Sequence, residues 1–450
     1  MSTSTFARAH ALMVDAASPV LAGQVSRILG LGLEVTGLSG TQRVTAVGTA
    51  VPVGTLLEIG AQRIPAEVVA AEGTILRCMP LAPLEGVAVG DEVQRVLGPA
   101  LIPVGTGLIG RVLDGLGRPL DGRGPLRGHT MVPLEQAPPN PMSRRRITEQ
   151  LQLGIRSIDG LASVGRGQRM GLFAGSGVGK SSLLSMVARG TEAAVNVIVL
   201  VGERGREVRE FLEDDLGAAG LARSVVVVAT SDEPAQMRLR AAFTGTRIAE
   251  HFRSQGQDVL MMMDSLTRVA MAQREIGLSA GEPPATRGYP PSTFSLLARL
   301  LERAGTDAAG TITGIYTVLV DGDDHNEPVA DAARSILDGH VVLDRSLATA
   351  GHYPPIDVLN SISRVAGRVI TPAQASTATA LRRVLAARRS AQDLLDVGAY
   401  QRGANADVDA AVTHQEAIDG FLRQGLEQTV PLDVTWEHLR MLVRRWEGTA

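Results

Sequence analysis

Cysteine, lysine and aromatic residues are all scarce in this chain of 450 residues. The single cysteine, Cys78, cannot close an internal disulfide or build a site of several thiolates, so we expect a reducing compartment. Aromatic residues make up only 3% of the chain, which leaves little for a surface that stacks nucleic-acid bases. The formal net charge is -3, so no global basic field attracts nucleic acid. We therefore expect no nucleic-acid partner.

Long apolar segments are also missing. No stretch approaches the roughly 20 apolar residues that a helix needs to cross a bilayer. Residues 1–15 have neither a basic start nor a long apolar segment, so no secretory signal is expected. With 44% hydrophobic and 20% charged residues, the chain has the balance of a folded globular protein. We expect a cytoplasmic protein of about three domains, at roughly 150 residues each.

The basic residues are distributed in an unusual way. Of the 44 lysine and arginine residues, only Lys180 is a lysine. A compact ammonium group on a flexible stem is not interchangeable with the planar guanidinium group of arginine. The presence of a lysine at this one position therefore indicates a chemical role that arginine cannot fill.

A glycine-rich segment surrounds Lys180. Residues 174–181 read AGSGVGKS, between a strand-like apolar pattern over residues 167–173 and a helical apolar spacing over residues 182–189. A strand, a glycine loop and a helix form the context of a phosphate-binding loop. The glycines let backbone N–H groups turn towards the phosphates, and the start of the helix adds its positive dipole end. Lys180 would reach the β- and γ-phosphates, and the Ser181 hydroxyl would bind Mg²⁺.

The predicted nucleotide-binding residues are those of this loop and the start of the helix. They are Ala174, Gly175, Ser176, Gly177, Val178, Gly179, Lys180, Ser181 and Ser182. The first position is alanine where the motif has glycine, which is tolerable if its backbone φ is negative. The alternative is a glycine-rich turn that carries Gly-Lys-Ser by chance, and the strand and helix on either side disfavour it.

Hydrolysis of a bound nucleotide requires acidic residues as well as a phosphate-binding loop. The apolar segment 258–263 is typical of a buried strand and ends at Asp264, which we predict to hold magnesium. A second apolar strand, 195–201, precedes Glu203, the better candidate for the base that polarises water. The structural alternatives are a helix cap for Asp264 and a surface ion pair for Glu203.

Several motifs resemble those of a known family. The strings GERGRE at residues 202–207, MMDS at 262–265 and NSISRV at 360–365 are similar to the hexameric ATPases related to the α and β subunits of rotary ATP synthases. Within that group, the chain looks most like the ATPases of protein export in the bacterial flagellum and in type III secretion. The resemblance extends over nearly the whole chain and includes GRVLDG at 110–115, GEPPATRGYP at 281–290 and ILDGH at 336–340.

The resemblance supports the roles given to Lys180 and Glu203 and adds three further site residues. It implies that Arg268 approaches the γ-phosphate and that Tyr353 packs on the adenine of ATP. It also implies that Arg364 is an arginine finger, which reaches into the site of a neighbouring subunit and stabilises charge in the transition state.

The resemblance also implies an assembly. In the synthase relatives the water-activating glutamate and the finger arginine lie on different subunits, whereas here one chain carries both. Identical chains with a site on one edge and a finger on the other close into a ring, so a homohexamer is expected. Other partners implied by the family are a stator-like regulator, a central-stalk protein, an export gate at the inner face of the cytoplasmic membrane, and export substrates with their chaperones.

Three domains are expected along the chain. Residues 1–93 contain short apolar runs between glycines and prolines, which predict a small antiparallel β-barrel that forms the ring. Residues 94–369 alternate strands with helices, which predicts a parallel-sheet, P-loop (RecA-like) ATPase domain. Residues 370–450 are expected to be helical. The predicted barrel strands are 44–47, 56–59, 64–69 and 75–78, and the predicted C-terminal helices are 380–395, 408–422 and 434–446.

These observations together predict an ATP-driven export motor of α/β fold. It would be a Mg²⁺-dependent ATPase whose homohexameric ring energises export of flagellar proteins, with ATP and Mg²⁺ as cofactors. MAQREI at residues 271–276 looks more like the flagellar branch than like virulence secretion, which stays the first alternative. The second alternative is an RNA-translocating ring, but its binding domain would need aromatic residues, and none occurs between Ala7 and Gly98.

Overall fold

The chain forms two compact units in a computed structural model that describes residues 22–38, 51–320 and 327–447. Of the described residues, the first unit contains those up to Ala100 together with Pro234–Gln236 and Leu278–Glu282, and the second contains the others. The strand predicted at residues 44–47 lies outside the described residues. Within them, no helix is both long enough and apolar enough to pass through a membrane.

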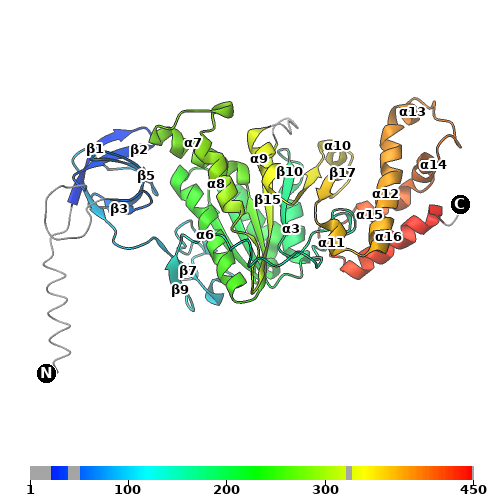
Figure 1. The fold of residues 1–450 in the computed structure, drawn as a ribbon, viewed down its shortest axis with the longest axis horizontal. Coiled ribbons are helices and arrows are strands. Elements are labelled where there is room, and N and C mark those ends of the chain that lie inside the picture. The colour runs from blue at the N-terminus through cyan, green and yellow to red at the C-terminus, as the bar shows by residue number, and fades with distance from the viewer. Residues whose placement is uncertain (1–21, 39–50, 321–326, 448–450) are drawn as a thin grey trace, which may run out of the picture. The chain divides into compact units, whose positions relative to one another are not determined.

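The first unit is a closed antiparallel barrel of six strands among the described residues (Figure 1). In the order of pairing, the strands are β1 (Ala22–Leu29), β2 (Gly32–Thr36), β5 (Ile75–Pro80), β4 (Ile64–Glu72), β3 (Leu56–Ile59) and β6 (Glu92–Arg95). Alternate side chains of β3 and β4 are buried, because successive residues of a strand point to opposite faces. Leu57, Ile59 and Val68 fill the interior without solvent exposure. The predicted barrel is therefore confirmed.

The second unit is built on a mainly parallel sheet. In spatial order the strands are β17 (Ile356–Ser363), β16 (Gly339–Leu343), β10 (Arg169–Ala174), β15 (Thr311–Leu319), β13 (Asp258–Asp264), β11 (Val195–Val201), β12 (Ser224–Ala229) and β8 (Val112–Leu113). The edge strand β17 runs antiparallel to β16, and the short β14 (Gly305–Thr306) pairs antiparallel with β15. Every residue of β11 and β12 is buried, as expected for strands that helices cover on both faces. A separate two-stranded antiparallel sheet pairs β7 (Leu101–Val104) with β9 (Thr130–Pro133).

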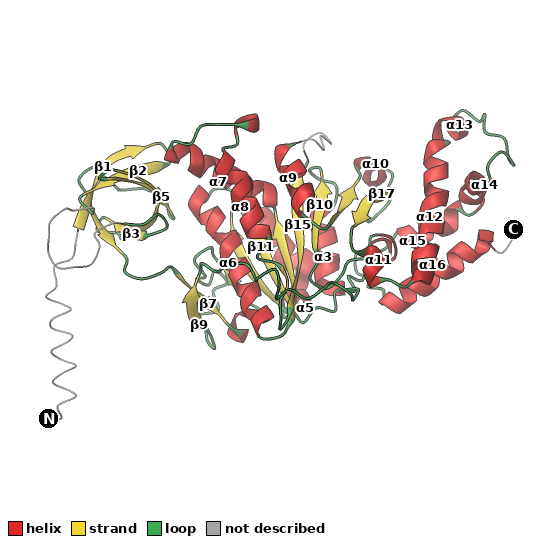
Figure 2. Ribbon diagram, viewed as in Figure 1, coloured by secondary structure: helices red, strands yellow, loops and turns green. Residues whose placement is uncertain are grey.

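Helices lie on both faces of this sheet. Figure 2 shows α6 (Ala235–Ser254) and α8 (Pro291–Leu301) on one face and α3 (Lys180–Gly190) on the other. The other helices of this region are α2 (Arg156–Leu161), α4 (Gly205–Glu210), a π-helix (Phe211–Leu216), α5 (Gly217–Leu221), α7 (Leu266–Ala280), α9 (Pro328–Ile336), α10 (Arg345–Thr349) and α11 (Ala366–Val369). Two short 3₁₀-helices complete it, at Thr106–Leu108 and Thr286–Gly288. The predicted P-loop type of fold is confirmed.

The end of the chain is helical, as predicted, but two of the three predicted helices are each interrupted by a break. They are α12 (Pro372–Ser390), α13 (Gln392–Asp396), α14 (Ala406–Thr413), α15 (Gln415–Leu422) and α16 (Leu432–Glu447). The single helices predicted over 380–395 and 408–422 are wrong, because the backbone leaves the helical conformation at Ala391 and His414. The apolar spacing continues through both breaks, so the sequence pattern alone does not mark them.

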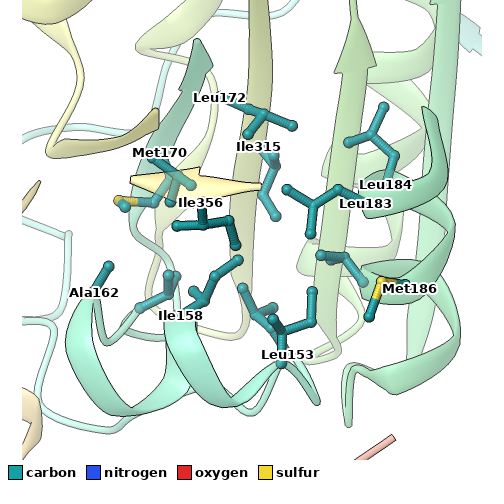
Figure 3. Packing of buried hydrophobic residues seen from close by; sticks show 14 of the residues in the cluster. Leu153, Ile158, Ala162, Met170, Leu172, Leu183, Leu184, Met186, Ile315 and Ile356 are labelled. Atoms are coloured by element: carbon teal, nitrogen blue, oxygen red, sulfur yellow. The ribbon is translucent and has the colours of Figure 1, made fainter. Parts of the chain in front are cut away.

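One apolar core joins the parallel sheet to these C-terminal helices. Figure 3 shows Leu172, Leu183 and Ile315, from β10, α3 and β15, packed with residues of the α2 region. The same buried cluster contains Trp436 and Leu439 of α16. Gly160 in α2 permits this packing, because a Cβ atom there would lie 3.3 Å from both Leu439 and Phe421. Sheet and C-terminal helices are therefore parts of one packed body.

Candidate active site

The glycine-rich loop connects β10 to α3, as the sequence predicts. Gly177 and Gly179 have φ of 73° and 101°, conformations that residues with a Cβ atom rarely adopt. Ala174 is the last residue of β10, so the extended backbone accommodates its methyl group without strain. The buried Val178 anchors the middle of the loop, and α3 begins at Lys180. The N–H groups of the first turn of α3 are thus available to an anion.

Lys180 brings together two carboxylates from different strands of the sheet. Its Nζ lies 2.5 Å from Oδ1 of Asp264, the last residue of β13, and 3.1 Å from Oε1 of Glu203, which follows β11. All three side chains are mostly buried, with exposed fractions of 13%, 5% and 18% for Lys180, Asp264 and Glu203. They meet because β10, β13 and β11 all end at the same edge of the parallel sheet, where ligands bind in such folds.

The charges of this cluster perturb one another. Burial alone would lower the pKa of Lys180, but the carboxylates of Asp264 and Glu203 outweigh it and the pKa is raised. Burial raises the pKa of Glu203, and the nearby charge of Asp264 raises it further. Lys180 is therefore held firmly as a cation, while Glu203 holds a proton more readily than an ordinary glutamate does.

Arg268 lies beside the residue that precedes Glu203. Gly202 has φ of 73°, and a Cβ atom there would come within 2.9 Å of the Arg268 side chain. The stem of Arg268, in the first turn of α7, is therefore held against the end of β11. Its buried Nε has no hydrogen-bond partner in the described part of the chain, and Nη1 makes a 3.8 Å contact with the sulfur of Met271. The guanidinium thus retains bonding capacity next to the acidic cluster.

Tyr353 lies against the phosphate loop. A Cβ atom at Gly179 would be 3.8 Å from the Tyr353 ring and 3.9 Å from Pro355. The residue is 47% exposed, and its carbonyl accepts a hydrogen bond of 2.9 Å from the backbone N–H of Gln424. A half-exposed aromatic ring beside the loop is suited to stacking on a base.

Arg364 is not part of this cluster. It directly follows β17, the edge strand of the sheet, whereas Lys180 and its carboxylates lie around the central strands. The side chain is exposed, and its Nη2 donates a hydrogen bond of 2.9 Å to the carbonyl of Arg334. A single chain therefore assembles all the predicted site residues except this arginine.

Oxygen ligands for a divalent cation are available at two positions. The Ser181 hydroxyl is exposed in the first turn of α3, and the Asp264 carboxylate lies beside Lys180. No group of three or more His, Cys, Asp or Glu side chains suited to a metal occurs among the described residues. Mg²⁺ is usually bound by one or two protein side chains together with phosphates and water. The donor set therefore fits a cation that arrives with a nucleotide.

Two further side chains contact the site, and the sequence did not predict them. The Thr317 hydroxyl, on β15, donates a hydrogen bond of 2.7 Å to Oδ1 of Asp264. Nη2 of Arg345 donates a hydrogen bond of 2.9 Å to the carbonyl of Ser176 in the loop. A threonine within an apolar strand is a weak signal, and neither residue belongs to one of the motifs described above.

A phosphate loop with a lysine and two acids at the carboxyl edge of a parallel sheet defines a P-loop nucleotide-binding protein. Residues 154–363 match the model of the ATP synthase alpha/beta family, nucleotide-binding domain, and residues 370–441 match the T3SS EscN ATPase C-terminal domain. The chain belongs to the family of flagellum-specific ATP synthases and type 3 secretion system ATPases. Its fold, its nucleotide substrate and its class of activity, an ATPase, are those of this family.

Three relatives illustrate the likeness. The flagellum-specific ATP synthase of Bacillus subtilis is 51% identical over 416 residues, which cover 91% of this chain and 92% of the relative. The type 3 secretion system ATPase of Xanthomonas euvesicatoria is 48% identical, over 93% of each chain. In a solved structure, the assembled ATPase EscN of enteropathogenic E. coli, in complex with its central stalk EscO, matches with a TM-score of 0.85 and 39% identity. That match covers 94% of this chain and all of the EscN chain in that structure.

Proposed function

We propose that this chain is a Mg²⁺-dependent ATPase whose homohexameric ring energises the export of flagellar proteins through a type III export apparatus. The observation that carries the proposal is the contact of Lys180 with both Glu203 and Asp264 at the end of the phosphate loop. This arrangement supplies a cation for phosphate, a carboxylate for a metal and a carboxylate for water within one buried cluster. The high identity to flagellum-specific relatives supports the choice of cargo.

The residues of the cluster divide the work of hydrolysis. Nucleotide phosphates would compete with Glu203 and Asp264 for the ammonium of Lys180, and Glu203 would then orient and deprotonate the attacking water. Ser181 and Asp264 would hold Mg²⁺, which neutralises charge on the phosphates when it is bound. Arg268 would approach the γ-phosphate, and Tyr353 would stack on the adenine. The unused bonding capacity of Arg268 supports its role.

The position of Arg364 supports the proposed homohexamer. This exposed arginine lies at the edge of the sheet and takes no part in the Lys180 cluster of its own chain. If it completes the site of the next chain, every copy both offers a finger and receives one, which closes a ring of identical subunits. The relative EscN, which has been solved in an assembled form, supports a ring for this chain.

The remaining partners and the location of the protein extend the same proposal. We place the ring in the cytoplasm, at the inner face of the membrane, with a stator-like regulator, an export gate, and export substrates with their chaperones. A central stalk is supported by the complex of EscN with EscO. We also keep the division into 1–93, 94–369 and 370–450, since the C-terminal family match begins at residue 370.

Virulence-type secretion is the second candidate, because a type 3 secretion system ATPase is 48% identical to this chain, which lies between the 45% and 51% of two flagellum-specific relatives. The two branches share the site, so only the cargo separates them. Restoration of motility in a flagellar-ATPase deletion strain, without restoration of needle secretion, would support the flagellar branch, and the reverse result would overturn it. The family assignment favours either form of export over an RNA-translocating ring.

Replacement of Glu203 tests the proposed chemistry. We expect Glu203→Gln to lower ATP turnover by about 10² or more, since general-base assistance is typically of this size. ATP binding should persist, because the phosphate loop is untouched. Glu210→Gln is the matched control, since Glu210 forms an exposed ion pair with Arg206 on the same stretch of chain. Hydrolysis by Glu203→Gln at the level of this control would show that another group is the base.

A further inference from the structure

Thr317 is a buried polar residue next to the metal-binding carboxylate. It belongs to β15, a central strand, and has no solvent exposure. Met263 of β13 is in register with Tyr316 of β15, so Asp264 and Thr317 are the next residues on two adjacent parallel strands. This placement brings the Thr317 hydroxyl to 2.7 Å from Oδ1 of Asp264.

The hydroxyl of Thr317 bonds mainly to the carboxylate. The other acceptor within reach, the carbonyl of Met263, is 3.3 Å away, and a hydroxyl has only one proton to donate. A hydrogen bond to an ionised carboxylate is shorter and stronger than one between neutral groups. The Thr317 hydroxyl therefore donates its hydrogen bond to Asp264 and not to the carbonyl of Met263.

The same oxygen of Asp264 also accepts from Lys180, at 2.5 Å. Both donors thus converge on Oδ1, which orients the carboxylate group and leaves Oδ2 for other ligands. The two restraints differ in permanence. A lysine that binds phosphate is drawn away from the carboxylate, whereas the threonine is fixed by a central strand of the sheet.

We propose that Thr317 is a positioning residue that holds the Asp264 carboxylate in the orientation needed for Mg²⁺ when Lys180 engages the nucleotide. The inference rests on the proposed function, because it assigns the metal to Asp264. Residues that orient a metal ligand through a hydrogen bond typically change metal affinity by about 10- to 100-fold when replaced. Loss of this hydrogen bond should therefore change the Mg²⁺ dependence of binding and hydrolysis and leave the fold unchanged.

The chain offers a matched control on the same strand. Thr313 is as buried as Thr317, with 1% exposure, and its hydroxyl accepts a hydrogen bond of 2.8 Å from the backbone N–H of Gly167. Replacement of either threonine by valine keeps the shape and removes one buried hydrogen bond. Only Thr317→Val removes a contact to Asp264.

The test compares Thr317→Val, Thr317→Ser and Thr313→Val by two measurements. The first is the Mg²⁺ concentration that gives half-maximal ATP hydrolysis, and the second is calorimetric binding of ADP with and without Mg²⁺. For Thr317→Val we expect the half-saturating Mg²⁺ concentration to rise about tenfold or more. Its binding of ADP should weaken only when Mg²⁺ is present. Thr317→Ser, which keeps the hydroxyl, should restore wild-type behaviour, and Thr313→Val should match wild type in Mg²⁺ dependence.

Two outcomes would overturn the assignment. One is a wild-type Mg²⁺ dependence for Thr317→Val, and the other is an equal shift for Thr313→Val, which would show a general structural effect. The two proposals also fail separately. A wild-type protein that does not hydrolyse ATP would refute the proposed function, whereas the ADP titrations would still measure whether Thr317 affects Mg²⁺-dependent binding.

Discussion

Replacement of Arg364 probes the division of the active site between two chains. The side chain is exposed at the edge strand, apart from the central cluster of Lys180, Glu203 and Asp264. Removal of the guanidinium should therefore leave nucleotide binding and the fold intact. We expect Arg364→Ala to lower turnover by about 10³ or more, which is the size of the effect of known arginine fingers.

A mixing experiment tests whether Arg364 acts on the site of the neighbouring chain. Lys180→Ala chains keep the finger arginine but lack the phosphate-binding lysine. Arg364→Ala chains keep the lysine but lack the finger arginine. In rings assembled at random from equal amounts of both, about one quarter of neighbouring pairs combine an intact lysine with an intact finger. If the sites act independently, ATP hydrolysis should recover to about one quarter of the wild-type rate per chain.

The control and the refutation use the same assay. Arg368→Ala removes another exposed arginine, in the short helix α11 that follows, and should hydrolyse ATP at the wild-type rate. Co-assembly of the two inactive variants is checked by sedimentation. A mixture that assembles into rings yet stays inactive would refute a finger that acts in trans. Full activity per chain in dilute, monomeric protein would refute it as well.

Two predictions concern stability. Glu250 and Arg303 form a bidentate ion pair with both contacts at 2.7 Å and 2% side-chain exposure. Glu250→Gln should therefore lower the free energy of unfolding, measured in urea, by about 3–5 kcal/mol. An unchanged unfolding midpoint would contradict this. The fully buried Asp159 accepts hydrogen bonds from two backbone N–H groups, and burial raises its pKa from 3.8 to about 7. Because the folded form then binds the proton more tightly than the unfolded form, stability should decline as the pH rises from about 4 to about 7. Thermal melting of Asp159→Asn should lose that slope, and an equal slope in both proteins would assign it to another group.

The sequence predicted the central sheet and the phosphate loop well. The strand 195–201 has the predicted bounds, because a run of β-branched residues between turns specifies a buried parallel strand. The loop around Lys180 could be predicted from the sequence because phosphate binding needs particular residue types in a fixed order. The meeting of Glu203 and Asp264 was predictable for a related reason, since acids at the ends of parallel strands converge on one edge.

Other features depend on neighbours that are distant in the sequence. The contact of Thr317 with Asp264 exists because β15 lies next to β13, an adjacency that no local pattern encodes. The breaks at Ala391 and His414 were missed because the apolar spacing runs through them and neither is a glycine or proline. Tertiary packing decides such positions, and local propensity does not override it.

The way α2 is packed has a consequence for how the molecule can change shape. Gly160 lets this short helix fit closely against Phe421 and Leu439, so the C-terminal helices share one apolar core with the sheet. A boundary that is easy to see in the sequence near residue 370 is therefore not a hinge. The C-terminal helices, α2 and the strands of the sheet share one buried cluster, so a displacement of these helices should also displace the sheet.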